Sequence, residues 1–85
     1  MNSVSIIGLL KEKIDDYFRY FEYDLPYIDE RNEAVPRIPV KFWSNQPNSR
    51  LIALPDHTKV AIHGHLDNNK EFGTILLVEK LEVLH

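Results

Sequence analysis

The segment Lys59–Asp67 constrains the fold most strongly, because its apolar residues recur at every second position. One row consists of Val60, Ile62, Gly64 and Leu66, and the other consists of Ala61, His63, His65 and Asp67. In a β-strand, this spacing places the two rows on opposite faces. A glycine within an apolar row usually marks a bend or the close approach of another backbone. The segment therefore predicts a bent strand with one buried row.

The same pattern occurs near the start of the sequence, at residues 2–10. Its alternating row consists of Asn2, Val4, Ile6, Gly8 and Leu10. In both segments the glycine takes the third position of the apolar row. Two such strands predict a sheet that curls on itself.

A helix is the alternative for the N-terminal region, because its apolar residues also recur every three to four positions. This second pattern includes Ile6, Ile7, Leu10, Ile14, Tyr17, Phe18 and Phe21. Within such a helix, Gly8 would cost about 1 kcal/mol relative to alanine. The aromatic run Tyr17–Tyr23 also has the composition of a strand. We favour strands and retain an α+β fold with an N-terminal helix as the alternative.

The rest of the sequence predicts three further strands and their connections. The expected elements are a strand at Tyr17–Leu25, a loop at Asp24–Arg37, a strand at Arg37–Trp43, a short apolar segment at Arg50–Leu54, a turn at Asp67–Lys70 and a strand at Thr74–Leu84. The short segment is either a helical turn or a strand that plugs the end of a barrel. The last strand requires a bulge at Glu79-Lys80, because its apolar residues change parity there. The 85 residues are expected to form one all-β domain.

Composition limits the classes of function. The chain has no cysteine, which excludes disulfides and thiolate metal sites and fits a reducing cytoplasm. We expect neither a signal peptide nor a membrane span, because no basic leader is present and Gly8 interrupts the first apolar run. The net charge of −3 opposes general phosphate binding. Binding to nucleic acid would therefore need a local basic patch, for which residues 11–50 supply several lysines and arginines.

Five strands with a short plug between the third and the fourth describe an OB-fold barrel. Four segments resemble strands of bacterial single-stranded DNA-binding proteins, namely Asn2–Leu10, Ile38–Trp43, Lys59–Leu66 and Val78–Leu84. The sequence stops at His85, directly after the last expected strand, without the acidic tail of that family. In this respect it is more similar to the primosomal replication protein B type, a tailless OB-fold dimer. The resemblance implies a five-stranded all-β OB-fold barrel.

The resemblance also implies a mode of binding, in which bases stack on aromatic rings and cations follow the phosphates. Trp43 matches a stacking aromatic of the family, and Phe72 lies one place from another. Tyr20 would add a ring from the second strand, while the phosphates would be bound by Arg19, Arg37 and Lys41. We expect a non-enzymatic accessory protein of DNA replication or recombination that binds single-stranded DNA and needs no cofactor.

A protein-interaction subunit is the second hypothesis. The same barrel would dock on a larger replication enzyme (a polymerase, primase or helicase) and have little DNA affinity of its own. The acidic balance, the missing acidic tail and the aromatic strand at Tyr17–Leu25 favour this hypothesis. The segment Asp67–Asn69 also departs from the family, because it replaces basic residues there. Arg37 likewise stands where the family often has an aromatic residue. Self-association into a homo-oligomer is also open, whereas no membrane partner is expected.

Catalytic and metal sites have little support in the sequence. His63 and His65 share one strand face, but two histidines without cysteine are more typical of a solvated outer face. The acidic pairs Asp15-Asp16 and Asp29-Glu30 would point to opposite faces in strands, so neither pair suits acid–base chemistry. No serine–histidine pattern or phosphate-binding loop occurs. We therefore expect no catalytic residue and no metal ligand.

Overall fold

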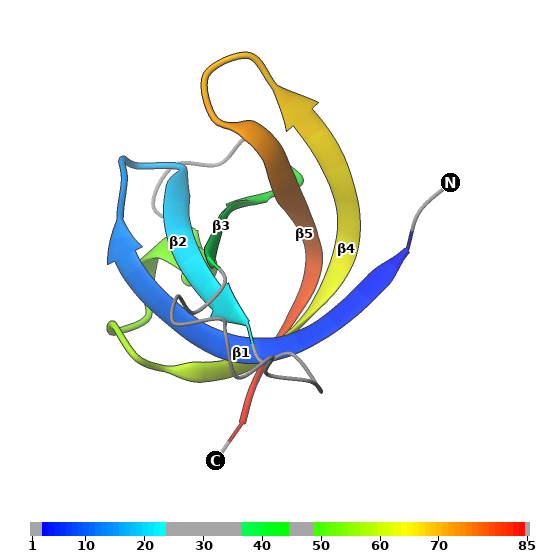
Figure 1. The fold of residues 1–85 in the computed structure, drawn as a ribbon. Helices are drawn as coiled ribbons and strands as arrows, with labels where there is room; N and C mark the ends of the chain where they lie inside the picture. Colours follow the sequence, from blue (N-terminus) through cyan, green and yellow to red (C-terminus); the bar gives the residue numbers. More distant parts are fainter. Residues whose placement is uncertain (1–2, 24–36, 45–48, 85) are drawn as a thin grey trace, which may run out of the picture.

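The computed structural model describes residues 3–23, 37–44 and 49–84. Its elements are β1 (Val4–Lys13), β2 (Phe18–Tyr23), β3 (Arg37–Phe42), α1 (Arg50–Ala53), β4 (Lys59–Asn69) and β5 (Gly73–Val83). The strands close into a barrel in the order β1-β2-β3-β5-β4, with β4 returning to β1 (Figure 1). Only the pairing of β3 with β5 is parallel among these neighbours. This order, with α1 between β3 and β4, is the five-stranded OB-fold barrel that the sequence predicts.

The N-terminal helix is excluded, because residues 4–13 and 18–23 are strands. β1 is long enough to pair with two neighbours, and it crosses the lower part of Figure 1 as one curved ribbon. Val4–Leu9 pair with β4, while Gly8–Lys13 pair with β2. Gly8 therefore has a neighbouring strand on each side. β1 closes the barrel at this point.

The two glycines of the alternating rows lie where another backbone approaches closely. A Cβ atom added to Gly8 would be 2.3 Å from the carbonyl oxygen of Glu22. At Gly64, it would be 1.9 Å from the carbonyl oxygen of Leu77. Both distances are far inside van der Waals contact. The prediction that these glycines mark close approaches within the barrel wall is confirmed.

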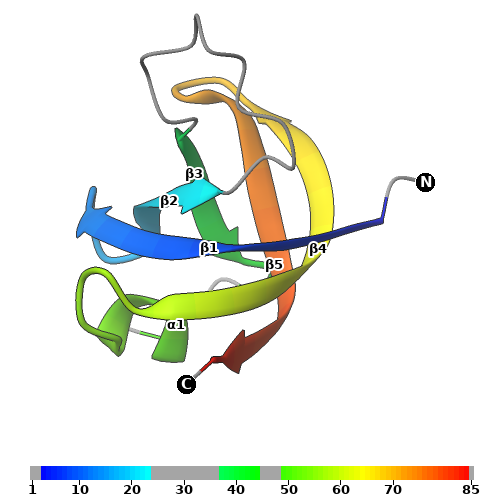
Figure 2. The ribbon, with the colours of Figure 1, turned by 60° about the horizontal axis from the view of Figure 1, so that its bottom comes forward.

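The core is built from the inward rows of all five strands and one residue of α1. Its fully buried members are Leu10, Phe21, Val40, Leu51, Val60, Ile62, Leu76 and Val78. In α1, both Leu51 and Ile52 are buried. The segment is thus the helical turn that the sequence offered as one of two options, and it lies below β1 at the lower left of Figure 2. Among the residues described, no helix is long and apolar enough to cross a membrane.

The predicted bulge in the last strand is confirmed. The register of β4 with β5 steps from His63 opposite Lys80 to Gly64 opposite Val78. Glu79 is therefore the extra residue, and the step reconciles the two parities of β5. Residues 24–36 lie outside the described part of the chain, and with them most of the expected loop Asp24–Arg37.

Candidate nucleic-acid interface

The outer side chains of four strands form a continuous row across the barrel. Lys41 on β3 lies opposite Phe18 on β2 and opposite Leu77 on β5, and Leu77 in turn lies opposite His65 on β4. The adjacent residue Val40 belongs to the core, so Lys41 points outward. Strand register therefore brings one cation and one aromatic side chain together on the outer face.

Lys41 lies beside two aromatic rings. Its Nζ atom is 5.8 Å from the ring centroid of Phe18 and 5.9 Å from that of Tyr17, within the range of a cation–π contact. Phe72, in the turn between β4 and β5, reaches the same place, with its ring 4.8 Å from that of Phe18 and tilted by 54°. Phe18 is buried by these contacts, whereas Tyr17 and Phe72 remain half-exposed. We call these four residues the aromatic–lysine cluster.

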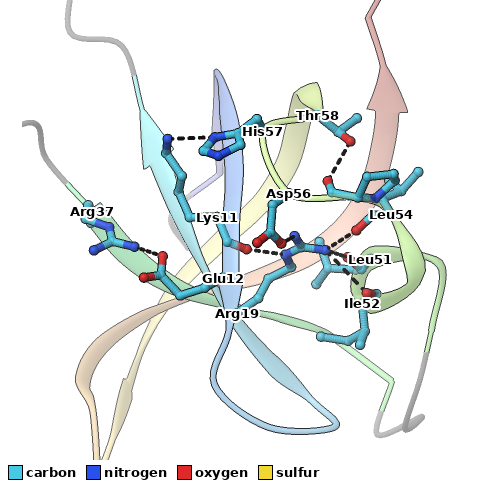
Figure 3. Close-up of polar contacts among 11 residues, drawn as sticks. Lys11, Glu12, Arg19, Arg37, Leu51, Ile52, Leu54, Asp56, His57 and Thr58 are labelled. Atoms are coloured by element: carbon cyan, nitrogen blue, oxygen red, sulfur yellow. Dashed lines mark hydrogen bonds and ion pairs between the residues drawn. The ribbon is translucent and has the colours of Figure 1, made fainter.

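Tyr20 and Arg37 form a second contact on the same face. The guanidinium of Arg37 stacks 4.5 Å above the ring of Tyr20. The same guanidinium pairs with the carboxylate of Glu12 (Figure 3). The pKa of Glu12 lies below its ordinary value, chiefly because a backbone hydrogen bond stabilises the carboxylate, with a smaller contribution from Arg37. The carboxylate of Glu12 thus already pairs with Arg37, the side chain that the sequence assigns to phosphate binding.

Arg19 is fully buried, and the structure places it away from this face. Nε donates to the carbonyl of Lys11 at 2.9 Å, and Nη2 contacts Asp56 Oδ1 at 2.9 Å. Nη1 reaches the carbonyls of Leu51, Ile52 and Leu54 at 3.0, 3.3 and 2.7 Å (Figure 3). Burial lowers the pKa of Arg19, and the charge of Asp56 opposes that shift. Arg19 joins the barrel wall to α1, and a phosphate has no access to it.

Trp43 follows β3 and is 60% exposed. Its backbone N–H donates to the carbonyl of Val78 at 2.9 Å, which fixes it beside β5. With His65 and Glu79 it lines a shallow hollow. His65 Nδ1 lies 2.7 Å from Glu79 Oε1. Among the described residues, the neighbours of this tryptophan in the hollow are an imidazole and a carboxylate.

The three histidines within the described residues, which include His63 and His65 on one strand, have separate partners. His63 contacts Ser5 at 2.7 Å, His57 contacts Lys11 at 3.0 Å, and His65 contacts Glu79. The bulge separates His63, opposite Lys80, from His65, opposite Leu77. Within residues 3–23, 37–44 and 49–84, no group of three histidine or acidic side chains could hold a metal ion.

The structure therefore divides the six predicted site residues into four places. Lys41 and Phe72 belong to the aromatic–lysine cluster, Tyr20 and Arg37 contact each other, Trp43 lines the hollow, and Arg19 is buried. Sequence reasoning did not single out Glu12, and it named Glu79 only as part of the expected bulge. The burial of Arg19 did have a signal, because Arg19 shares its strand parity with Phe21.

Comparison of the chain with protein-family models and with curated proteins finds no match. The fold and the face described above define an OB-fold barrel with aromatic and cationic side chains on the outer surface of β2 and β3. The resemblance to single-stranded DNA-binding proteins stays a prediction from short motifs.

Proposed function

We propose that the protein is a small accessory protein of DNA replication or recombination that binds single-stranded DNA in the cytoplasm. OB-folds bind oligonucleotides on the face of the second and third strands and on the loops that follow the first and the fourth. In this chain, the aromatic–lysine cluster occupies those positions. Lys41 lies on the third strand, Tyr17 precedes the second, and Phe72 lies in the turn after the fourth. This coincidence of ring, cation and position is the observation that carries the proposal.

The binding mode follows from the chemistry of the side chains. Bases stack on the accessible faces of Tyr17, Tyr20 and Phe72, and such contacts contribute about 1–3 kcal/mol per base. Lys41 neutralises one phosphate. Arg37 neutralises a second one when the phosphate displaces Glu12. No bond is made or broken, so the protein acts by holding the strand and needs no cofactor.

The proposal is tested by fluorescence anisotropy with a labelled oligothymidine at low salt, using Lys41→Gln. We expect this variant to weaken binding about tenfold, because it removes a charged contact from the centre of the face. The slope of log affinity against log salt should fall in magnitude by about 0.7, the value for one phosphate on a single strand. Both readouts distinguish a phosphate contact from a general loss of fold.

Lys80→Gln is the matched control for this experiment. Lys80 is exposed on β5 opposite His63, on the part of the wall near β1, and its loss changes the net charge by the same amount. We expect the control to bind within about twofold of the wild type. Equal losses in the two variants, or no binding by the wild type at low salt, would show that the proposal is wrong.

A second candidate function is docking on a larger replication enzyme. The specific observation in its favour is Trp43, which is 60% exposed although tryptophan is a residue enriched in protein interfaces. The net charge of −3 suits a protein partner better than a phosphate backbone. Co-purification of a large partner with the intact chain, together with no oligonucleotide binding by the chain alone, would favour docking over direct DNA binding.

A further inference from the structure

The hollow beside Trp43 is built by the bulge of β5. Glu79 is the residue without a partner in the register of β4 and β5, and its side chain is 57% exposed. Trp43 is held next to it by the hydrogen bond from its backbone to Val78, the residue that precedes Glu79. His65 enters from β4 and contacts the Glu79 carboxylate at 2.7 Å. Three separate strand regions thus position an indole and a carboxylate around one hollow.

The chemistry of this lining suits a cation. An indole face is the strongest aromatic acceptor for a cation–π contact, and a neighbouring carboxylate supplies the opposite charge. His65 fixes the carboxylate, so less side-chain freedom is lost when a ligand binds. A phosphate would face Glu79 directly, and the net charge of −3 also opposes it. The hollow therefore differs in kind from the aromatic–lysine cluster, which presents a cation.

We propose that the hollow lined by Trp43, His65 and Glu79 binds an arginine side chain of a protein partner. A planar guanidinium can stack on the indole while its N–H groups donate to the Glu79 carboxylate, which a lysine ammonium cannot do in the same geometry. The site requires neither Lys41 nor Tyr20. The hollow shares no residue with the aromatic–lysine cluster, so binding at the hollow can be tested separately from DNA binding. It assigns Trp43 to a protein contact in place of base stacking.

Trp43 is the only tryptophan in the sequence, so its fluorescence reports directly on the hollow. The intact protein is titrated with N-acetylarginine methylamide, and in parallel with the citrulline analogue, which has the same shape without the charge. We expect a saturable change of Trp43 emission with the arginine compound, in the millimolar range that a single side-chain contact permits (about 1–50 mM). The citrulline compound should produce at most a fifth of that change.

Glu79→Gln and Glu82→Gln make a matched pair on the same strand. Both change the net charge equally, but Glu82 lies opposite Ala61, away from the hollow. We expect Glu79→Gln to weaken binding of the arginine compound at least about fivefold, whereas Glu82→Gln stays within about twofold. Circular dichroism of both variants checks that the barrel is intact, and Trp43 emission then remains a valid reporter in each.

Two outcomes would overturn this proposal. Equal responses to the arginine and citrulline compounds would mean that the hollow makes only an apolar contact. If Trp43→Leu instead weakens oligothymidine binding as strongly as Lys41→Gln does, the tryptophan belongs to the nucleic-acid face. The first outcome involves no oligonucleotide, so it does not depend on whether Lys41→Gln changes DNA affinity, and a failure of one proposal can be told from a failure of the other.

Discussion

At the scale of single residues, Arg19 contributes to stability through the carbonyls at the end of α1. A helix end leaves carbonyl groups without partners, and a four-residue helix has few other means of satisfying them. The guanidinium of Arg19 donates hydrogen bonds to the carbonyls of Leu51, Ile52 and Leu54, and it also forms an ion pair with Asp56. One side chain of β2 therefore holds the plug in the barrel.

We expect Arg19→Met to lower the free energy of unfolding by about 3 kcal/mol, because several buried carbonyls lose their donor while the volume is largely kept. Arg19→Lys should recover only part of the loss, since one ammonium cannot reach all of these oxygens. Asp56→Asn should cost at most about 1 kcal/mol, because the carboxylate is half-exposed and screened by water. Urea denaturation measures all three. Wild-type stability of Arg19→Met would contradict the role of Arg19.

At the scale of elements, the close approach of β4 and β5 depends on Gly64. Gly64 lies opposite Val78, directly beside the bulge at Glu79. A side chain here would force the carbonyl of Leu77 away and separate the strands. Gly73, at the start of β5, differs because its φ of +75° needs a glycine conformation although the space around it is open.

We expect Gly64→Ala to destabilise the protein by about 3 kcal/mol or more, at the upper end of the cost of overpacking. Gly73→Ala is the control. We expect it to lower the free energy of unfolding by about 1 kcal/mol, because only the left-handed backbone conformation opposes a side chain there. The midpoints of chemical denaturation give the comparison. A larger loss in Gly73→Ala than in Gly64→Ala would mean that backbone conformation, rather than close packing, governs this hairpin.

The alternation of inward and outward side chains along each strand explains which sequence-based predictions succeeded, and contacts outside that alternation explain the errors. Alternation gave the strands, the buried glycines and the bulge, because period-two burial is a local property of a barrel wall. The expected turn at Asp67–Lys70 is displaced, since β4 continues to Asn69. Asn69 Oδ1 accepts hydrogen bonds from the backbone N–H groups of Glu71 and Phe72, and so starts the turn later. Contacts between distant segments, such as the hydrogen bond from Trp43 to Val78, depend on strand order and had no local signal.

At the scale of the whole molecule, the question is whether net charge or local pairing governs binding to a strand. The chain carries thirteen acidic and ten basic residues, so its overall field opposes phosphate. At 0.1 M salt, however, exposed charges more than about 10 Å apart are largely screened. A carboxylate in contact with a cation of the face should then matter more than a distant one. Glu12, which pairs with Arg37, is that carboxylate.

If the proposed DNA binding holds, Glu12→Gln should raise affinity for oligothymidine about threefold at 0.1 M salt, because Arg37 is released for phosphate. Glu82→Gln makes the same change in net charge, but Glu82 lies on β5 opposite Ala61. We expect its gain in affinity to be less than about half of the gain from Glu12→Gln. Anisotropy titrations of both variants provide the measurement, with the double variant Glu12→Gln, Arg37→Gln as the internal check. The gain must vanish in the double variant, because no cation is left to release. Equal gains from Glu12→Gln and Glu82→Gln would instead mean that the field of the whole protein controls access of the strand to the face.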